Sequence, residues 1–313
     1  MSKIKTVFVA GPTASGKTEL AIKLAKRFDG EIISADSMQI YKGIHIASAA
    51  PDTAEMHGIP HYMLEFLEPG DSFSVAEYVK AARAYIKDIA SRGRLPIVAG
   101  GTGLYINSLA DNISYIEEET DENLRRELEK RFDSAGAEQM LNELKEIDPD
   151  TAERLNLNDK KRIIRAFEVY RLTGRTITEQ NALSKKGEAL IYPCIIGITY
   201  RDRERLYDRI NLRVDKMLSA GLIDEAKAAL ENTAGGAYQA IGHKELGGYI
   251  SGDLTLEEAA ENLKRQTRRY AKRQLTWFRR DERINWIYAD ETDDVAANAA
   301  KIVEKFLRTE ETD

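Results

Sequence analysis

Apolar residues recur along this chain at two different spacings, and each spacing predicts a different element. Short, mostly apolar runs at 6–10, 31–34 and 95–99 predict buried parallel strands. Apolar residues three and four positions apart at 17–27 and 74–92 predict helices between those strands. Strands that alternate with helices are typical of an α/β fold in which helices flank a mostly parallel sheet.

The pattern changes in the middle of the chain. From 117 to about 180 the spacing is helical and no strand pattern occurs. The segment 36–74 carries glycine and proline at irregular intervals and predicts a long irregular connection. Later elements are expected as a strand at 190–200, helices at 203–220, 255–278 and 293–307, and a strand at 283–289. The predicted domains are 1–115, the first part of the core, 116–185, an all-helical insertion, and 186–313, which completes the core.

The turn after the first strand has the pattern of a P-loop, G-x-x-x-x-G-K-S/T, between a strand and a helix. Backbone N–H groups of such a turn, together with the N-terminus of the following helix, attract phosphate oxygens. Lys17 adds a full positive charge, and the Thr18 hydroxyl suits a Mg²⁺ ion. The expected phosphate-binding residues are Gly11, Pro12, Thr13, Ala14, Ser15, Gly16, Lys17 and Thr18.

The acidic residues differ from those of a typical P-loop nucleoside triphosphatase. Such an enzyme has a strand that ends in an acid for Mg²⁺, whereas here the third strand runs into Gly100, Gly101 and Thr102. The acid stands instead at Asp36, directly after the second strand, where α/β proteins place catalytic groups. Asp36 is therefore a candidate metal ligand or general base, although an isolated Ala-Asp-Ser is more typical of a turn.

The net charge of −6 argues against a polyanionic partner only as an average over the chain. Residues 160–175 carry a charge of +5 and residues 264–280 carry +8, so the remaining residues carry −19. Tyr270, Trp277 and Phe278 alternate with the cations of the second segment. Cations without neighbouring acids repel each other and favour an anionic partner. Nucleic acid and the acidic body of the protein itself are both open as that partner.

The composition excludes several classes of protein. The single cysteine, Cys194, excludes an internal disulfide and a cysteine zinc site, and its apolar neighbours predict a buried thiol. No apolar run is long enough to span a membrane, and no leader-like segment precedes the first strand. We expect a cytoplasmic protein with no membrane partner.

Six motifs occur in a characteristic order. They are the P-loop, ISADSMQIY at 33–41, GGTGLY at 100–105, the segment at 158–168, QAIGHKE at 239–245 and TRRYAKRQLTWFR at 267–279. Together these motifs resemble those of bacterial tRNA dimethylallyltransferases, also called tRNA isopentenyltransferases, over almost the whole chain. That family transfers a dimethylallyl group from dimethylallyl diphosphate to N6 of the adenosine immediately 3′ of certain anticodons. The resemblance implies the same fold, reaction and substrates here, and we expect a monomer.

The resemblance also implies a role for each matching residue. The P-loop would hold the leaving diphosphate with Mg²⁺ on Thr18, Thr102 being a second candidate ligand, and Arg209 or Arg213 would add a cation. Asp36 would be the general base, with Lys17 and Thr102 as the other catalytic residues. The tRNA anticodon stem-loop would contact Asp36, Ser37, Met38, Gln39, Thr102, Arg125, Asn158, Asp159, Arg162, Arg165, Arg268, Lys272 and Arg273.

The sequence departs from the family pattern at three places, and three other functions are open. Ala50 replaces a customary lysine, Asn156–Leu157 replaces His-Pro and His243 replaces tyrosine; Ala50 puts one phosphate or tRNA contact in doubt. A P-loop kinase acting on a nucleotide or small molecule fits the cradle, and so does an adenylate isopentenyltransferase acting on free nucleotide. An RNA-binding protein with a vestigial P-loop is the third, which intact Lys17 and Asp36 argue against. The insertion and the basic segment favour a macromolecular acceptor.

Overall fold

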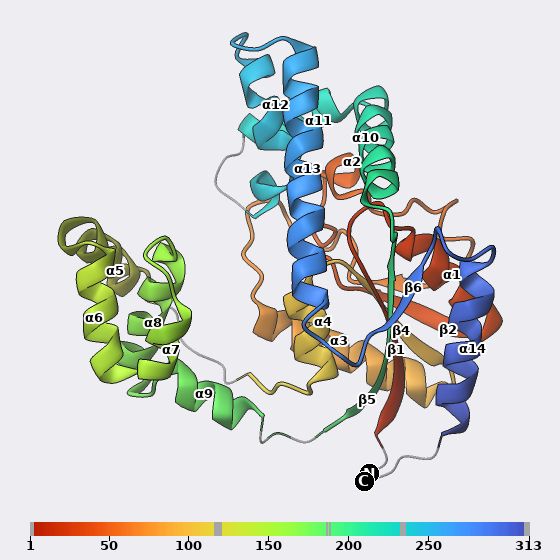
Figure 1. Cartoon of the computed structure of the whole chain (residues 1–313), viewed down its shortest axis with the longest axis horizontal. Coiled ribbons are helices and arrows are strands. Elements are labelled where there is room, and N and C mark those ends of the chain that lie inside the picture. Colours follow the sequence, from red (N-terminus) through yellow and green to blue (C-terminus); the bar gives the residue numbers. More distant parts are fainter. Residues whose placement is uncertain (1–2, 116–120, 186, 188, 232–235, 310–313) are drawn as a thin grey trace. The chain divides into compact units, whose positions relative to one another are not determined.

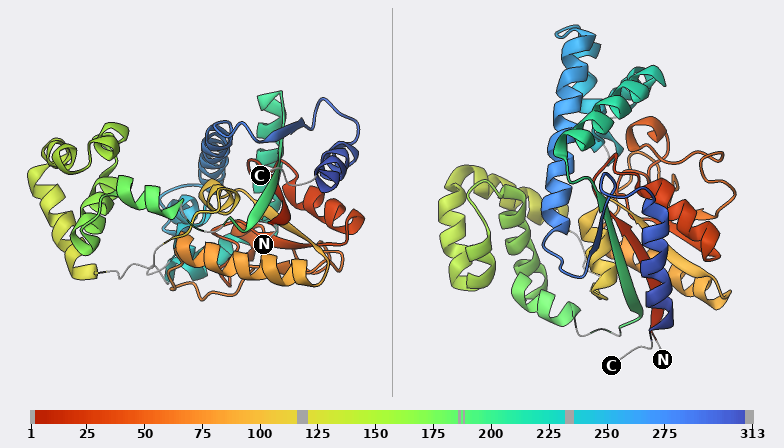
Figure 2. Two further views of the ribbon diagram at one scale, coloured as in Figure 1. Left: turned by 90° about the horizontal axis from the view of Figure 1, so that it is seen from below. Right: turned by 45° about the vertical axis from the view of Figure 1, so that its right-hand side comes forward.

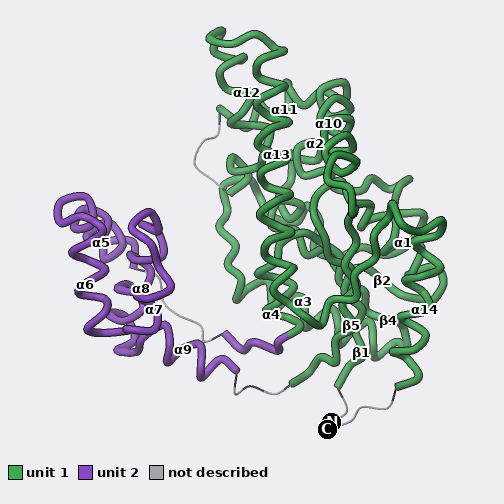
Figure 3. The backbone as a smooth tube through the Cα atoms, in the orientation of Figure 1, with its two compact units in different colours: residues 1–110, 189–313 green, residues 111–188 purple. Residues whose placement is uncertain are grey.

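The computed structural model describes residues 3–115, 121–185, 187, 189–231 and 236–309. The chain divides into two compact units (Figure 3). Unit 1 comprises residues 1–110 and 189–313, and unit 2 comprises residues 111–188. Each unit has an apolar core of its own.

Unit 1 is built on a six-stranded sheet with the strand order β3-β2-β4-β1-β5-β6, and every pair of neighbours is parallel. The strands are β1 (Ile4–Ala10), β2 (Gly30–Ser34), β3 (His61–Tyr62), β4 (Leu95–Gly100), β5 (Ile191–Thr199) and β6 (Asn285–Tyr288). Because parallel strands all end at one edge, the segments that follow β1, β2 and β4 meet there. This edge carries the P-loop, Asp36 and Thr102, and the expected α/β fold is confirmed.

Helices cover both faces of the sheet (Figures 1 and 2). On one face, α1 (Lys17–Arg27) and α14 (Val295–Arg308) pack against alternate strand residues such as Val7 and Val9. On the other, α3 (Val75–Ser91) and α4 (Gly103–Ala110) pack against β1, β4 and their neighbours. Successive strand residues point to opposite faces, so the uninterrupted buried run in β1 supplies both layers.

Further helices of unit 1 gather beyond the C-terminal edge of the sheet (Figure 1). They are α2 (His45–Ser48), α10 (Arg203–Ser219), α11 (Leu222–Glu231), α12 (His243–Ile250) and α13 (Leu256–Phe278), with a 3₁₀ turn at Ala237–Gln239. Helix α13 begins with a capping box, in which Thr255 and Glu258 bond each other's backbone N–H groups. It packs first against α10 and α12 and, further along, against α4, so it connects this helical group to the sheet edge.

Among its described residues, the regular elements of unit 2 are all helices. Its helices are α5 (Glu122–Ala135), α6 (Ala137–Ile147), α7 (Pro149–Arg154), α8 (Lys160–Thr173) and α9 (Ile177–Ser184). Asp148 is buried between α7 and α9, where it accepts hydrogen bonds from Thr151 N at 3.1 Å and from Thr178 Oγ1 at 2.6 Å. These bonds cap α7 and join it to α9.

Several short elements were not predicted from the sequence. The segment expected to be irregular contains the four-residue α2 and the two-residue β3, and α4, α11 and α12 were not expected at all. Elements of two to ten residues include at most three helical turns, too few to establish a periodicity. Cys194 is buried as expected, and burial raises the pKa of its thiol to about 11. Within the described residues, no helix is both long and apolar enough to cross a membrane.

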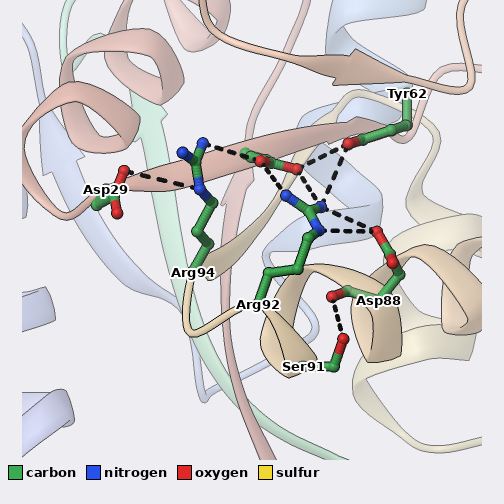
Figure 4. A network of polar contacts seen from close by, with 7 residues as sticks. Asp29, Tyr62, Asp88, Ser91, Arg92 and Arg94 are labelled. Carbon is green, nitrogen blue, oxygen red and sulfur yellow. Dashed lines mark hydrogen bonds and ion pairs between the residues drawn. The ribbon is translucent and has the colours of Figure 1, made fainter.

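A charged network ties β2 to the loop before β4 (Figure 4). The Glu31 carboxylate is buried and accepts two hydrogen bonds of 2.6 Å from the Arg92 guanidinium. Arg94 and the Tyr62 hydroxyl add bonds of 3.0 and 2.7 Å. Arg92 also contacts Asp88 at 2.9 Å. The Arg92 bonds are the main reason that the pKa of Glu31 is held at about 2, and Tyr62 and Arg94 add to them.

Glu31→Gln keeps the shape of this network but removes its charge. A carboxylate with a depressed pKa stabilises the fold fully above its ordinary pKa of 4.5, and the contribution is lost as the pH falls through about 2. We expect the variant to lose about 2 kcal/mol of unfolding free energy at pH 7. The difference from the unmodified protein should shrink by more than half at pH 3. Urea denaturation at both pH values measures it; equal stabilities at pH 7 would contradict the assignment.

Candidate active site

The P-loop joins the end of β1 to the start of α1. Its turn is closed by a hydrogen bond from Ser15 N to Pro12 O at 3.3 Å. Lys17 and Thr18 are the first two residues of α1, and Thr18 is exposed. The buried hydroxyl of Ser15 has no hydrogen-bond partner among the described residues. The turn therefore has the polar groups and the helix N-terminus that an anion requires.

Lys17 lies where a positive charge is unfavourable without an anion. Its Nζ donates to Pro12 O at 2.6 Å. The pKa of Lys17 is lowered to about 7, mainly by burial and also by the positive charge of Arg213, while Asp36 acts in the opposite direction. A bound anion would restore the ammonium form, because opposite charge favours the charged state. This electrostatic arrangement is that of an anion site.

Asp36 follows β2 and faces the same region. Its Oδ1 accepts a hydrogen bond from Met38 N at 2.9 Å, as an Asx turn does. No second hydrogen bond or ion pair of this carboxylate occurs among the described residues, so Oδ2 is available. Its negative charge opposes the lowering of the pKa of Lys17 and of Arg213 by burial. It also adds to the raised pKa of Tyr270. Asp36 is thus both part of a turn and a charged group within reach of the P-loop.

Thr102 is bonded to the segment that follows Asp36. Its Oγ1 accepts from Ser37 N at 2.9 Å and donates to Ser37 Oγ at 3.3 Å, while Thr102 N donates to Ala35 O at 3.0 Å. The hydroxyl proton and one lone pair of Thr102 are therefore engaged. The exposed Thr18 hydroxyl has no such partner in the described part of the chain, which makes it the better metal ligand of the two.

The structure distinguishes the two candidate arginines. Arg209 is exposed, and its Nε donates to Ala14 O at 2.9 Å, so it supports the P-loop from outside. Arg213 makes no hydrogen bond or ion pair with a described residue. Burial lowers the pKa of its guanidinium, and the negative charges of Asp36 and Glu55 act against that effect. Arg213, rather than Arg209, is the cation that shares the site with Lys17 and Asp36.

Other residues of the segment after β2 serve its own structure. Gln39 accepts from Ser34 Oγ at 2.8 Å and donates to Ala49 O at 3.1 Å, so its amide is engaged within the protein. Met38 packs on the apolar cluster around Ile40. Ala50, at the position of the customary lysine, is buried. Of Ser37, Met38 and Gln39, none presents an unengaged polar side chain in this arrangement.

Glu225 of α11 holds the same segment from the other side. Its two carboxylate oxygens accept from Ile46 N at 2.7 Å and Ala47 N at 2.8 Å, at the N-terminus of α2. The fully buried His243 contacts Glu225 Oε1 at 3.2 Å. A carboxylate at a helix N-terminus is electrostatically favourable. Glu225 is not recognisable from the sequence, because no local pattern connects it with a residue 179 positions away.

Helix α13 contacts the loops of the site through two side chains, Gln274 and Trp277. Buried Gln274 accepts from Thr13 N at 2.8 Å and donates to Gly101 O at 2.9 Å. A Cβ atom at Gly101 would lie 2.2 Å from Gln274 Nε2, and one at Gly103 would lie 2.2 Å from the Trp277 ring. The two glycines are therefore needed for the close approach of α13. Gln274 stands in the motif at 267–279, and a glutamine among the inward-facing positions of a long helix was the available signal.

The basic residues of α13 are only partly neutralised inside the protein. Lys264 contacts Asp215 at 2.8 Å and Glu261 at 3.4 Å. Half-buried Arg268 donates to Asn211 Oδ1 at 2.6 Å. The exposed cations that have no hydrogen bond or ion pair with a described residue are Arg269, Lys272, Arg273, Arg279 and Arg280. Arg269, Lys272 and Arg273 lie on α13, and Arg279 and Arg280 directly follow its last residue; we call these five residues the basic face of α13.

The predicted tRNA residues of unit 2 are more neutralised than their sequence indicates. Four of the six cations in 160–175 have an acidic partner: Lys160 with Asp133, Arg162 with Asp159, Arg165 with Glu168 and Arg171 with Glu127. Arg125 contacts Glu129 at 3.7 Å, and Asn158 is exposed. The charge of +5 therefore overstates the free positive charge, because acids on α5 neutralise part of it.

Three comparisons with known proteins agree. The family model "IPP transferase" matches residues 39–281. The tRNA dimethylallyltransferase of Acetivibrio thermocellus is 51% identical over 288 residues, which cover 91% of this chain and 92% of that protein. The protein of the same name from Caldanaerobacter subterraneus is 46% identical over 292 residues, 92% of this chain and 93% of that protein.

Solved structures show the same relationship. The tRNA isopentenylpyrophosphate transferase of Bacillus halodurans is 40% identical, with a TM-score of 0.69 over 98% of this chain and 99% of that one. A eukaryotic dimethylallyltransferase described as acting on tRNA is 29% identical, with a TM-score of 0.81 over 98% of this chain and 80% of that one. With a parallel α/β core, a P-loop and these relatives over nearly its full length, the chain belongs to the IPP transferase family.

Proposed function

We propose that this protein transfers the dimethylallyl group of dimethylallyl diphosphate to N6 of the adenosine immediately 3′ of the anticodon in tRNA. The products are N6-dimethylallyladenosine in tRNA and free diphosphate. The observation that carries the proposal is the placement of Lys17, Arg213 and Asp36 around one region at the C-terminal edge of the sheet. Such a site combines a cradle for a leaving anion with a carboxylate, in a family whose relatives carry this activity in their names.

The diphosphate is bound by the P-loop, Lys17 and Arg213. As the bond between C1 of the dimethylallyl group and the diphosphate oxygen breaks, negative charge grows on the departing oxygen. Preorganised N–H groups and the two cations therefore stabilise the transition state, in which this charge has grown, more than they stabilise the ground state. Mg²⁺ fits at the exposed Thr18 hydroxyl and would supply further charge neutralisation, since Mg²⁺ is commonly held by few protein oxygens together with phosphates and waters.

Asp36 serves as the general base. N6 of adenine is a weak nucleophile because its lone pair is delocalised into the ring. As N6 bonds to C1, one N6 proton passes to the available Oδ2 of Asp36, while Oδ1 stays bonded to Met38 N. Thr102 is a positioning residue in this arrangement, because its hydroxyl orients Ser37 next to Asp36.

The tRNA binds along the basic face of α13 and along unit 2, at Arg125, Asn158, Asp159, Arg162 and Arg165. The anticodon stem-loop supplies phosphates for the cations, and its unstacked adenosine enters the site near Asp36. Arg268 contributes to tRNA binding only indirectly, because its guanidinium contacts Tyr207 and Asn211 inside the protein. The monomeric state and the cytoplasmic location stay predictions.

Labelled dimethylallyl diphosphate tests the proposal directly. The purified chain is incubated with this donor, Mg²⁺ and unmodified tRNA, and in parallel reactions with AMP, with ATP and with no acceptor. We expect label in tRNA only, at the adenosine 3′ of the anticodon. Label in AMP or ATP would identify a free-nucleotide prenyltransferase. If tRNA gains no label and phosphate is transferred from ATP, the protein would be identified as a kinase.

Neutralising part of the basic face of α13 should weaken tRNA binding, because fewer phosphates are then paired with a cation. In the triple variant Arg269→Gln, Lys272→Gln, Arg273→Gln, we expect the slope of log K against log salt to fall by about 0.7–0.9 for each phosphate that is no longer neutralised. Filter binding of the stem-loop at several salt concentrations measures the slope. The charge-matched control replaces Lys301, Lys305 and Arg308, which are exposed on α14. Equal slopes for the two variants would show that α13 does not bind tRNA.

A further inference from the structure

Gln274 is the one described side chain that hydrogen-bonds both to the P-loop and to the loop after β4. Its Oε1 accepts from Thr13 N at 2.8 Å, and its Nε2 donates to Gly101 O at 2.9 Å. The side chain is 6% exposed. A buried amide with both of its ends bonded has a single favourable orientation, so it fixes the distance between the two loops.

The neighbours of Gln274 on α13 extend this contact. Trp277, three residues further on, lies against Gly103, and Tyr270, four residues earlier, is close enough to Asp36 for that charge to raise its pKa in addition to burial. Positions i, i+4 and i+7 share one helix face. The other faces of the same turns present Arg269, Lys272 and Arg273 to solvent. One helical segment therefore contacts the diphosphate cradle on one side and offers cations on the other.

We propose that Gln274 is a positioning residue that couples the occupancy of the basic face of α13 to the shape of the diphosphate cradle. Because the backbone N–H of Thr13 is bonded to Gln274, it does not point toward the phosphate. The same bond orients the remaining N–H groups of the turn. A small shift of α13 on tRNA binding moves Gln274, and with it Thr13 and Gly101, together. The inference rests on the proposed function, in which diphosphate and tRNA are the two ligands.

Coupling of this kind is reciprocal and measurable without turnover. Calorimetry gives the Kd of inorganic diphosphate with Mg²⁺, alone and with saturating anticodon stem-loop. In the unmodified protein we expect the stem-loop to change that Kd. In Gln274→Met, which keeps the volume and removes both bonds, we expect diphosphate alone to bind about tenfold more weakly. The effect of the stem-loop on the diphosphate Kd should then disappear.

Two further variants separate positioning from simple folding. Gln266→Met makes the same change on the same helix at a half-buried residue with no hydrogen bond to a described residue, and it should leave both values unchanged. Gly101→Ala would place a Cβ 2.2 Å from Gln274 Nε2 and should reproduce the defect of Gln274→Met. The double variant should then be no worse than either single one.

Three results would overturn the inference. They are an unchanged diphosphate Kd in Gln274→Met, additive effects of Gln274→Met and Gly101→Ala, or losses of melting temperature and of stem-loop affinity that are the same in Gln274→Met and Gln266→Met. These readouts do not need prenyl transfer. If the stem-loop changes the diphosphate Kd only when Gln274 is present, while no label enters tRNA, the inference stands and the proposed function fails.

Discussion

Asp36→Asn is expected to reduce the rate of prenyl transfer by about 10²–10⁴-fold, the range typical of losing a general base. The amide keeps an oxygen that can accept from Met38 N, so the turn after β2 is retained. It cannot take the N6 proton. The anticodon stem-loop should bind with an unchanged Kd, because binding depends mainly on cations. Single-turnover transfer of labelled dimethylallyl groups and filter binding measure the two quantities.

One side effect must be separated from the loss of the base. The Asp36 carboxylate raises the pKa of Lys17, so its removal leaves Lys17 less protonated at neutral pH. Saturating dimethylallyl diphosphate removes this effect from the measured rate. Asp29→Asn is the matched control, because the Asp29 side chain is exposed and precedes the opposite end of the same strand. A wild-type rate in Asp36→Asn would show that another group accepts the proton.

Lys17→Met is expected to weaken diphosphate binding by about 10–100-fold, the value of one charge-assisted hydrogen bond. In the unmodified protein the affinity should also depend on pH. The pKa of Lys17 is about 7 without ligand, and the anion binds the protonated form. Binding therefore takes up a proton, and the Kd should rise about tenfold per pH unit above 7. Well below pH 7 the contribution of Lys17 should be constant.

Calorimetry in buffers of different ionisation enthalpy counts the protons taken up. Lys17→Met should abolish the rise of the Kd as the pH increases above neutral. Lys23→Met is the control, because Lys23 lies on the same helix, is exposed and pairs with Glu19 at 2.7 Å. If the pH dependence persists in Lys17→Met, the titrating group is another one.

The local pattern was sufficient where an element is long and its interactions are local. Helix α13 agrees with the expected range 255–278, because its apolar stripe extends along the whole helix and its capping residues Thr255 and Glu258 are only three residues apart. The P-loop agrees for the same reason, since its residues are contiguous. Helix α2 and strand β3 were missed because four and two residues are too short for any periodicity.

The candidate site was predicted less completely than the fold. Asp36 and Thr102 were expected near the P-loop, because parallel strands end at one edge. The choice between Arg209 and Arg213 was open in the sequence, as both lie on one helix one turn apart. The structure separates them, because only Arg209 is bonded to Ala14 O. The free charge of 160–175 was overestimated, since its acidic partners Asp133 and Glu127 lie on another helix.

By itself, the sequence determined the α/β class, the phosphate cradle, the helical character of residues 121–184 and the family resemblance. These depend on residues close together in the chain or on motifs in a fixed order. Three-dimensional packing alone shows which cations lack a partner among the described residues, which arginine acts electrostatically on Lys17, and that Gln274 joins Thr13 to Gly101. Those properties arise from contacts between residues up to 261 positions apart. Burial then changes their hydrogen bonds and pKa values in ways that no local pattern records.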